Sequence, residues 1–152
     1  MLSIEFNQTG VIFMRKNEPI SRIMSTDIQA VQQGQPLSEV YQILSNTGVH
    51  HVPILDSKKL VGLISLTDMM KLDMAIQGAD GRTLSAVLDQ QFSVQDVMTK
   101  SLVTLTNESN VRDAAAQLGN GAFHALPVVN GDDELLGMVT STDLIRYLSE
   151  QY

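Results

Sequence analysis

Apolar residues recur at helical spacing in two segments of this chain, residues 37–44 and 111–118. In each segment they occupy positions i, i+3, i+4 and i+7, which form one stripe along an α-helix. The stripe residues are Leu37, Val40, Tyr41 and Leu44 in the first segment and Val111, Ala114, Ala115 and Leu118 in the second. The pattern predicts two helices that each bury one face. A shorter stripe at Leu84, Val87 and Leu88 predicts a further helix between them.

The same kinds of apolar run surround both helices. A short apolar turn comes first, at Ile20–Met24 and at Val94–Met98, and an extended stretch follows, at 28–31 and at 102–105. After each helix, two nearly continuous apolar runs flank a polar turn, which is typical of strands covered on both faces. These runs are Val52–Leu55 with Leu60–Ile64, and Leu126–Val129 with Leu135–Val139. A second helix is predicted to begin at Asp68 and at Asp143.

The two halves are therefore copies of one pattern: strand, helix, strand, strand, helix. Residues 20–59 align with 94–133 at an offset of 74, and residues 60–71 align with 135–146 at an offset of 75. The identical pairs are Met24/Met98, Leu44/Leu118, Asn46/Asn120, His50/His124, Pro53/Pro127, Leu60/Leu135, Gly62/Gly137, Thr67/Thr142 and Asp68/Asp143. A copy of about 55 residues buries too little apolar surface to be stable alone. We expect an α+β fold in which both copies share one core about a pseudo-twofold axis.

This repeat sets the predicted domain boundaries. Residues 1–19 form an N-terminal extension, residues 20–72 the first copy, residues 73–92 a connecting insertion and residues 93–152 the second copy.

Composition narrows the class of function. The 152 residues include no cysteine, which excludes disulfides and cysteine metal or redox sites. A net charge of -7 argues against nucleic-acid binding, which needs clustered Lys and Arg. The sequence has no apolar run of membrane-spanning length and its first residues do not resemble a secretory signal, so we expect a cytoplasmic protein.

Candidate chemistry lies where each predicted second helix begins, at Ser65–Asp68 and Thr140–Asp143. Backbone N–H groups at a helix start point outward at the positive end of the helix dipole, and they stabilise an anion such as phosphate. Hydroxyls of Thr67 and Thr142, with those of Ser65 and Thr140, add donors, and the carboxylates are able to accept from ribose hydroxyls. The same spacing is also typical of a helix-capping box without any ligand.

Two other repeated residue types have a structural and a ligand-binding interpretation. His50 and His124 are either structural side chains beside a strand or donors to phosphate. Met24 and Met98 either fill the core or line an adenine ring. No His pairs with an acidic residue at metal-binding spacing, so no metal site is expected.

The complete order of motifs resembles the CBS domain, and two in tandem resemble a Bateman module. The matching text is His50–Ile54 with Gly62–Asp68, and His124–Val128 with Gly137–Asp143. The resemblance implies tandem β-α-β-β-α domains that bind an adenine nucleotide (AMP, ADP or ATP) and regulate rather than catalyse. It also implies a homodimer, with a regulated protein partner that the sequence does not name.

The resemblance further implies that each site draws residues from both copies. One site would hold Met24, Gln29, Val49 and His50 with Thr140, Thr142 and Asp143. The other would hold Met98, Val103, Phe123 and His124 with Ser65, Thr67 and Asp68. The nearest cations after the two aspartates are Lys71 and Arg146, so the number of phosphates stays open.

Two alternative functions compete with nucleotide sensing. An interaction scaffold with unoccupied clefts would use apolar helix faces to bind a partner chain. An enzyme would use His50, His124, Asp68 and Asp143 as acid–base groups, but the sequence has no nucleophile motif, metal triad or glycine-rich phosphate loop to support it. We therefore expect no catalytic residues and no catalytic cofactor.

Overall fold

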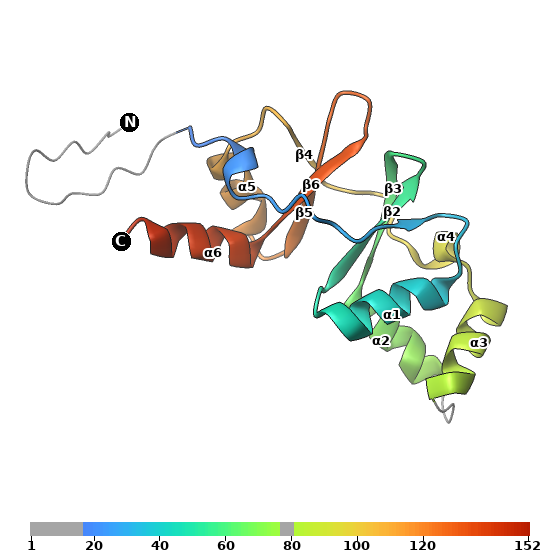
Figure 1. The fold of residues 1–152 in the computed structure, drawn as a ribbon. Helices are drawn as coiled ribbons and strands as arrows, with labels where there is room; N and C mark the ends of the chain where they lie inside the picture. Colours follow the sequence, from blue (N-terminus) through green and yellow to red (C-terminus); the bar gives the residue numbers. More distant parts are fainter. Residues whose placement is uncertain (1–16, 77–80) are drawn as a thin grey trace, which may run out of the picture. The chain divides into compact units, whose positions relative to one another are not determined.

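The computed structural model describes residues 17–76 and 81–152, and the predicted N-terminal extension lies outside this part up to residue 16. Along the chain the elements are η1 (Ile20–Arg22), β1 (Val31–Gln32), α1 (Leu37–Thr47), β2 (His51–Asp56), β3 (Lys59–Ser65), α2 (Leu66–Ala75), α3 (Gly81–Gln91), α4 (Val94–Val97), β4 (Leu105–Thr106), α5 (Val111–Leu118), β5 (Ala125–Val129), β6 (Leu135–Thr140) and α6 (Ser141–Glu150) (Figure 1). The predicted α+β class and the β-α-β-β-α order of each copy are confirmed.

Each copy forms its own three-stranded mixed sheet, in the orders β1-β2-β3 and β4-β5-β6. β1 runs parallel to β2, β2 runs antiparallel to β3, and β4 runs parallel to β5. Val31 pairs with Ile54, and its repeat counterpart Leu105 pairs with Val128. The predicted extended stretches at 28–31 and 102–105 are only partly strands, because β1 and β4 have two residues each.

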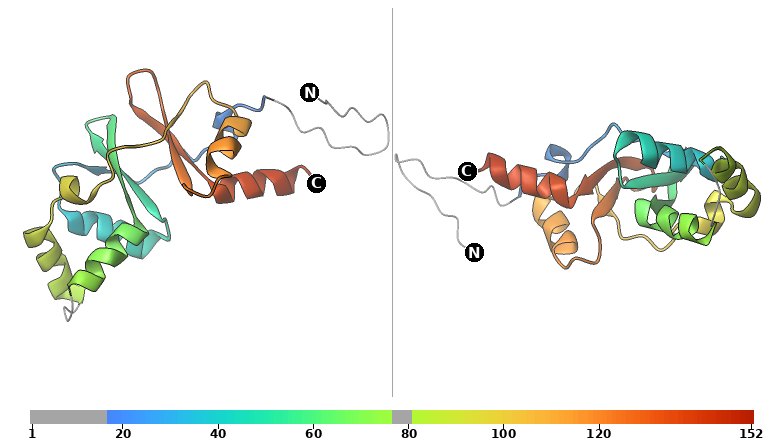
Figure 2. Two further views of the ribbon diagram at one scale, coloured as in Figure 1. Left: turned by 180° about the vertical axis from the view of Figure 1, so that it is seen from behind. Right: turned by 90° about the horizontal axis from the view of Figure 1, so that it is seen from below.

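The short segments that precede each sheet are exchanged between the copies. The chain falls into a first compact unit, with the segment through Ile28, Val103–Gly131 and Leu136–Tyr152, and a second, with Gln29–Leu102 and Asp132–Leu135. In the first unit Ser25 forms an antiparallel bridge with Met138 of β6, and in the second unit Thr99 forms the equivalent bridge with Leu63 of β3. The exchanged segments, which we call leaders, are residues 19–28 and 94–102 (Figure 2 shows them from two further sides).

Buried apolar residues form two clusters, one in each unit, rather than the single shared core that we expected. Leu37, Val52 and Ile64 belong to the cluster of the second unit, which also takes Val94 from the second copy's leader. Leu126 and Val139 belong to the cluster of the first unit, which also takes Ile20 from the first copy's leader. Because each leader fills the core of the opposite copy, each unit closes a core of its own.

Helix starts and ends follow local chemistry. α2 and α6 begin at Leu66 and Ser141, two residues before the predicted starts, because Ser65 and Thr140 are the N-caps. At α5, Asn110 and Asp113 form the capping box that their spacing favours. At the end of α1, Gly48 adopts a φ of 71°, the left-handed conformation that glycine accepts without steric cost.

α3, predicted from its apolar stripe, packs beside α1 in the second unit. Leu88 is fully buried in the core there. Asp89 accepts hydrogen bonds from the Ser38 backbone N–H at 2.8 Å and from the Ser38 hydroxyl at 2.6 Å. α1 has Pro36 at its N-cap and no capping side chain of its own, so α3 supplies the missing acceptor.

Among the residues that the structure describes, no helix is both long enough and apolar enough to cross a membrane.

Candidate functional site

The starts of α2 and α6 carry the same capping box with nearly the same geometry. In the second unit, Asp68 Oδ2 accepts from the Ser65 N–H and hydroxyl, each at 2.8 Å, and the Asp68 N–H donates to Ser65 Oγ at 3.1 Å. In the first unit, Asp143 Oδ2 accepts from the Thr140 N–H at 2.8 Å and hydroxyl at 2.9 Å, and the Asp143 N–H donates to Thr140 Oγ1 at 3.2 Å. The helix-capping interpretation of both motifs is therefore correct.

Capping uses only one oxygen of each carboxylate. An ionised carboxylate has about four acceptor positions, two on each oxygen. The box fills those of Oδ2, and Oδ1 of Asp68 makes no hydrogen bond or ion pair with the described residues. Two adjacent hydroxyls are the kind of donor that fits one such oxygen. At Asp68, capping thus leaves one carboxylate oxygen that a ligand hydroxyl is able to use.

The histidines lie next to these helix starts through their backbone. The carbonyl of His50 accepts from the N–H of Leu66 at 2.8 Å, and the carbonyl of His124 accepts from the N–H of Ser141 at 3.1 Å. Both histidine side chains are exposed. The structure therefore brings His50 to the Asp68 helix start and His124 to the Asp143 helix start. The predicted combinations of His50 with Asp143 and of His124 with Asp68 join the two units and stay predictions.

At each helix start, a threonine carries donor groups that make no hydrogen bond among the described residues: Thr67 in α2 and Thr142 in α6. The first and third N–H groups of each helix are bonded, to a histidine carbonyl and to the capping hydroxyl. The hydroxyls of Thr67 and Thr142 are exposed and make no hydrogen bond among the described residues. These donors, rather than the hydroxyls of Ser65 and Thr140, are available to an anion.

The two methionines pack against glycines of the strands that lead to the helix starts. A Cβ at Gly62 of β3 would lie 2.7 Å from Met98 Cγ, and a Cβ at Gly137 of β6 would lie 2.8 Å from Met24 Sδ. Only glycine allows this approach at either position. Both methionines are half-buried beside the core, so the packing interpretation holds for them. Adenine contact at these residues stays a prediction.

The remaining predicted site residues lie in different surroundings. Val49 and Phe123, which precede the histidines, are large apolar side chains with 39% and 36% of their surface exposed. Gln29 is exposed, whereas Val103 packs against the core of the first unit. Val49 and Phe123 thus offer apolar surface beside the helix starts, and Val103 offers little.

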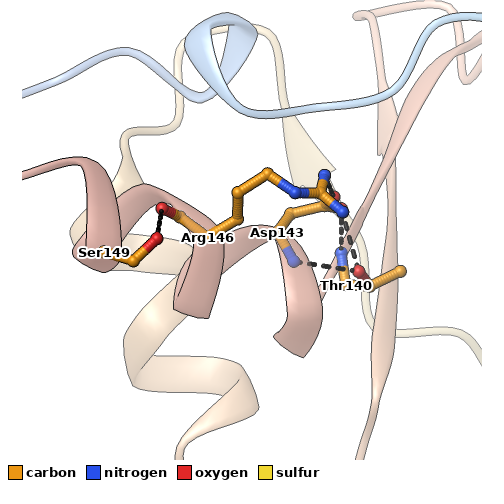
Figure 3. Close-up of polar contacts among 4 residues, drawn as sticks. All are labelled: Thr140, Asp143, Arg146 and Ser149. Carbon is orange, nitrogen blue, oxygen red and sulfur yellow. Dashed lines mark hydrogen bonds and ion pairs between the residues drawn. The ribbon is translucent and has the colours of Figure 1, made fainter.

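A cleft in the first unit adds residues that the sequence did not suggest. It has a volume of about 140 Å³ and is lined by Arg22, Ile23, Asp143, Arg146, Tyr147 and Glu150. Arg146 lies over Asp143 with Nη1 3.5 Å from Oδ1 (Figure 3). Arg22 pairs through Nε with Oε1 of Glu18 at 3.7 Å, and Glu18 is buried. Arg22 belongs to a leader, so its proximity to Asp143 depends on the exchange that the repeat pattern did not reveal.

The described residues hold no group of three or more His, Cys, Asp or Glu side chains arranged to bind a metal ion.

Comparison with known proteins places this geometry in a family. The CBS domain pattern matches residues 20–75 and 94–150. The chain is 28% identical over 132 residues to a homoserine O-acetyltransferase of Methanohalobium evestigatum, covering 86% of this chain and 24% of that protein. It is 28% identical over 154 residues to the chloroplastic CBS domain-containing protein CBSX1 of Arabidopsis thaliana, covering 88% and 61%. The chain therefore spans between about a quarter and three fifths of the length of these two curated relatives.

Solved structures show the same fold. CBSX2 in complex with AMP superposes with a TM-score of 0.72 at 25% identity, covering 88% of this chain and 97% of that chain. The CBS domain pair of protein MJ0100, in complex with 5′-methylthioadenosine and S-adenosyl-L-methionine, superposes with a TM-score of 0.71 at 23% identity, covering 90% and 99%. With its motif matched twice and its fold shared with these pairs, the chain belongs to the CBS domain family, as a tandem pair.

Proposed function

We propose that this chain is a regulatory module that binds an adenine nucleotide of the AMP, ADP or ATP type and catalyses no reaction. The observation that carries the proposal is the second carboxylate oxygen at each capped helix start, which the capping box does not use, next to a threonine whose hydroxyl makes no hydrogen bond among the described residues. At Asp68 this oxygen is free of the described residues, and at Asp143 it pairs with Arg146 at 3.5 Å. A carboxylate that accepts from two ribose hydroxyls beside a phosphate-binding helix start is a recurring arrangement in nucleotide sites. CBSX2, 25% identical to this chain, was solved with AMP.

In this proposal Asp68 and Asp143 bind ribose, and Thr67 and Thr142 donate to phosphate. Val49 and Phe123 contact the adenine rings of the two ligands. Further residues that line the adenine sites are Met24, Met98, Gln29 and Val103. His50 and His124 donate to phosphate. The hydroxyls of Ser65 and Thr140 hold the aspartates in place rather than contact the ligand.

Thermal unfolding with AMP, ADP, ATP, adenosine and GMP tests this proposal. A ligand that binds only the folded chain stabilises it by about 2.7 kcal/mol at a hundredfold excess over its dissociation constant. We expect stabilisation by adenine nucleotides and not by GMP. We expect none in the double variant Asp68→Asn/Asp143→Asn, whose amides still accept from the N-cap N–H but no longer offer a carboxylate. Folded wild-type protein that responds to no adenine compound would refute the proposal.

The matched control is Asp113→Asn. Asp113 holds the same position of a capping box, with its carboxylate 2.9 Å from the Asn110 N–H, but it lies outside the proposed site. Its loss should lower stability as much as either site substitution and leave the nucleotide response intact.

A homodimer is the second proposal, and it is compatible with the first. Its supporting observation is exposed apolar surface on α2 and α6, with Met70 56%, Met74 76%, Ile145 67% and Leu148 41% exposed. Within each helix these side chains are three or four residues apart and therefore share one face, and apolar side chains that gather on an exposed helix face mark an interaction site. Sedimentation equilibrium of wild type and of Met74→Glu/Ile145→Glu tests it. The proposal predicts a dimer that dissociates in the variant, and a monomeric wild type would refute it.

A further inference from the structure

The repeat relates the surroundings of the α2 and α6 starts, because several single contacts of one unit recur in the other. Residues with equivalent repeat numbers are therefore compared between the two units. The bridge of Ser25 with Met138 corresponds to that of Thr99 with Leu63 at the offsets of 74 and 75. The packing of Met24 on Gly137 corresponds in the same way to that of Met98 on Gly62. Each leader therefore has the same register on its strand at these residues, so the leader positions that precede them are compared by their repeat numbers.

At one such place the two units carry opposite charges. Arg22 lines the cleft that contains Asp143. Its repeat counterpart in the second unit is Asp96, whose carboxylate accepts from the Ser93 N–H at 3.1 Å in the capping box of α4. Hydrogen bonds from Ser93 lower the pKa of Asp96, and Lys100 acts in the same direction, so Asp96 is ionised at neutral pH. The first unit thus carries an arginine at the leader position where the second carries an ionised aspartate.

The other cleft residues add to this contrast. Arg146 corresponds to Lys71 and Tyr147 to Leu72. A guanidinium presents five N–H donors in a planar fork that matches two phosphate oxygens, whereas an ammonium acts as a point charge. The first unit therefore has two forked donors near Asp143, and the second unit has none at the equivalent places.

The carboxylates near the cleft do not remove this preference. Glu18 is buried and lies 3.7 Å from Nε of Arg22, so its charge is already paired with that guanidinium. Asp143 pairs with Arg146 through the oxygen that ribose would take, so ribose binding frees that guanidinium. Glu150 lines the far part of the cleft, seven residues and about 10 Å along α6 from Asp143. The distinction between the units is thus one of directed donors rather than of total charge.

We infer that the two adenosine sites differ in ligand class: the site at Asp143 takes the phosphorylated ligand, with Arg22 as a specificity residue, and the site at Asp68 takes an adenosine compound without phosphate. The inference rests on the proposed function, since it assigns ligands to the same two aspartates. A carboxylate at position 96 repels phosphate and leaves an uncharged nucleoside unaffected. A guanidinium at position 22 attracts phosphate by charge-assisted hydrogen bonds.

Calorimetric titration of the whole chain with AMP and with adenosine tests the inference. In wild type we expect AMP to bind at one site per chain. Asp143→Asn should abolish AMP binding and Asp68→Asn should leave it. Arg22→Gln should weaken AMP about tenfold, the loss of roughly one charge-assisted contact, and leave adenosine unchanged.

Three further variants keep the result interpretable. Arg22→Gln leaves the buried Glu18 without its partner, so Glu18→Gln/Arg22→Gln serves if the single variant unfolds. Glu150→Gln removes a charge from the same cleft and should leave AMP affinity equal or higher. Asp96→Asn should raise AMP affinity at the second site.

The outcomes separate the inference from the proposed function. If wild type binds neither AMP nor adenosine, the proposed function fails and the inference fails with it. If both ligands bind but Arg22→Gln leaves the ratio of AMP to adenosine affinity unchanged, the inference is wrong and the proposed function stands. Loss of AMP binding in Asp68→Asn but not in Asp143→Asn likewise overturns the inference alone.

Discussion

At the scale of single residues, the two aspartates show how one side chain serves both stability and binding. Oδ2 of Asp68 completes a capping box while Oδ1 stays free of the described residues. Asp143 differs because Arg146 lies 3.5 Å from its second oxygen. The Arg146 side chain is 65% exposed, whereas that of Asp143 is 11% exposed. Because water screens the exposed guanidinium, we expect a ribose hydroxyl to displace Arg146 at small cost.

Gly62 and Gly137, which occupy the same position in the two copies, give a prediction for stability. A Cβ at Gly137 would lie 2.9 Å from the Ser25 carbonyl oxygen, which is backbone and cannot turn aside. Gly137→Ala should destabilise the chain by about 1–3 kcal/mol in urea unfolding. Gly34→Ala meets nothing within 4 Å and should change stability by less than about 0.5 kcal/mol. Equal effects of the two substitutions would contradict the packing described for Met24.

The sequence alone predicts some of these residue-level contacts and not others. Asn110 with Asp113 was predictable because a capping box depends on residues three apart. The helix starts at Leu66 and Ser141 were predicted two residues late. Asp68 and Asp143 were each predicted as the first helical residue, whereas each is the third and closes a capping box with Ser65 or Thr140. The position of Arg22 beside Asp143 was not predictable, because it depends on contacts between segments far apart in the chain.

At the scale of elements, capping decides where the helices begin. Ser65→Ala and Thr140→Ala each remove an acceptor for a first-turn N–H and should cost about 1 kcal/mol of unfolding free energy. Thr67→Ala and Thr142→Ala lie in the same turns, make no hydrogen bond among the described residues, and should leave the stability of the free protein nearly unchanged. Urea denaturation without ligand measures both pairs. A larger loss from the Thr67 and Thr142 variants would contradict the assignment of the caps.

The capping box of α4 gives a prediction for pH. Hydrogen bonds from Ser93 hold the pKa of Asp96 below its ordinary value. A lowered folded-state pKa stabilises the fold above the unfolded-state pKa of about 3.9, and this stabilisation is lost as the pH falls through the lower folded-state value. The stability difference between wild type and Asp96→Asn should therefore be constant from pH 7 to pH 5 and shrink below about pH 4. Urea midpoints measured across this range test it, and a difference that grows on acidification would contradict it.

At the scale of the whole molecule, the exchanged leaders organise the fold. The repeat predicted two similar copies and a family, and both are confirmed. It did not predict that each copy is completed by the other's leader, because the apolar character of Ile20 or Val94 does not say which sheet it covers. The expected single core gave way to two cores for the same reason.

Leader exchange predicts that a substitution in one copy weakens the sheet of the other. Ile20→Ala, at a fully buried site, should cost about 2–5 kcal/mol. Hydrogen exchange should then speed up at β5 and β6 more than at β2 and β3. Val94→Ala, the repeat counterpart, should show the opposite pattern. Faster exchange at β2 and β3 in Ile20→Ala would contradict the exchange of leaders.

The central claim is that this tandem CBS pair binds adenosine ligands through Asp68 and Asp143, and that AMP is one of them. The most direct measurement is isothermal titration of AMP into wild type, Asp68→Asn/Asp143→Asn and the capping control Asp113→Asn, each first shown to be folded. The account predicts binding by wild type and by Asp113→Asn, and none by the double variant. Absence of binding to wild type, or equal binding by all three proteins, would contradict it.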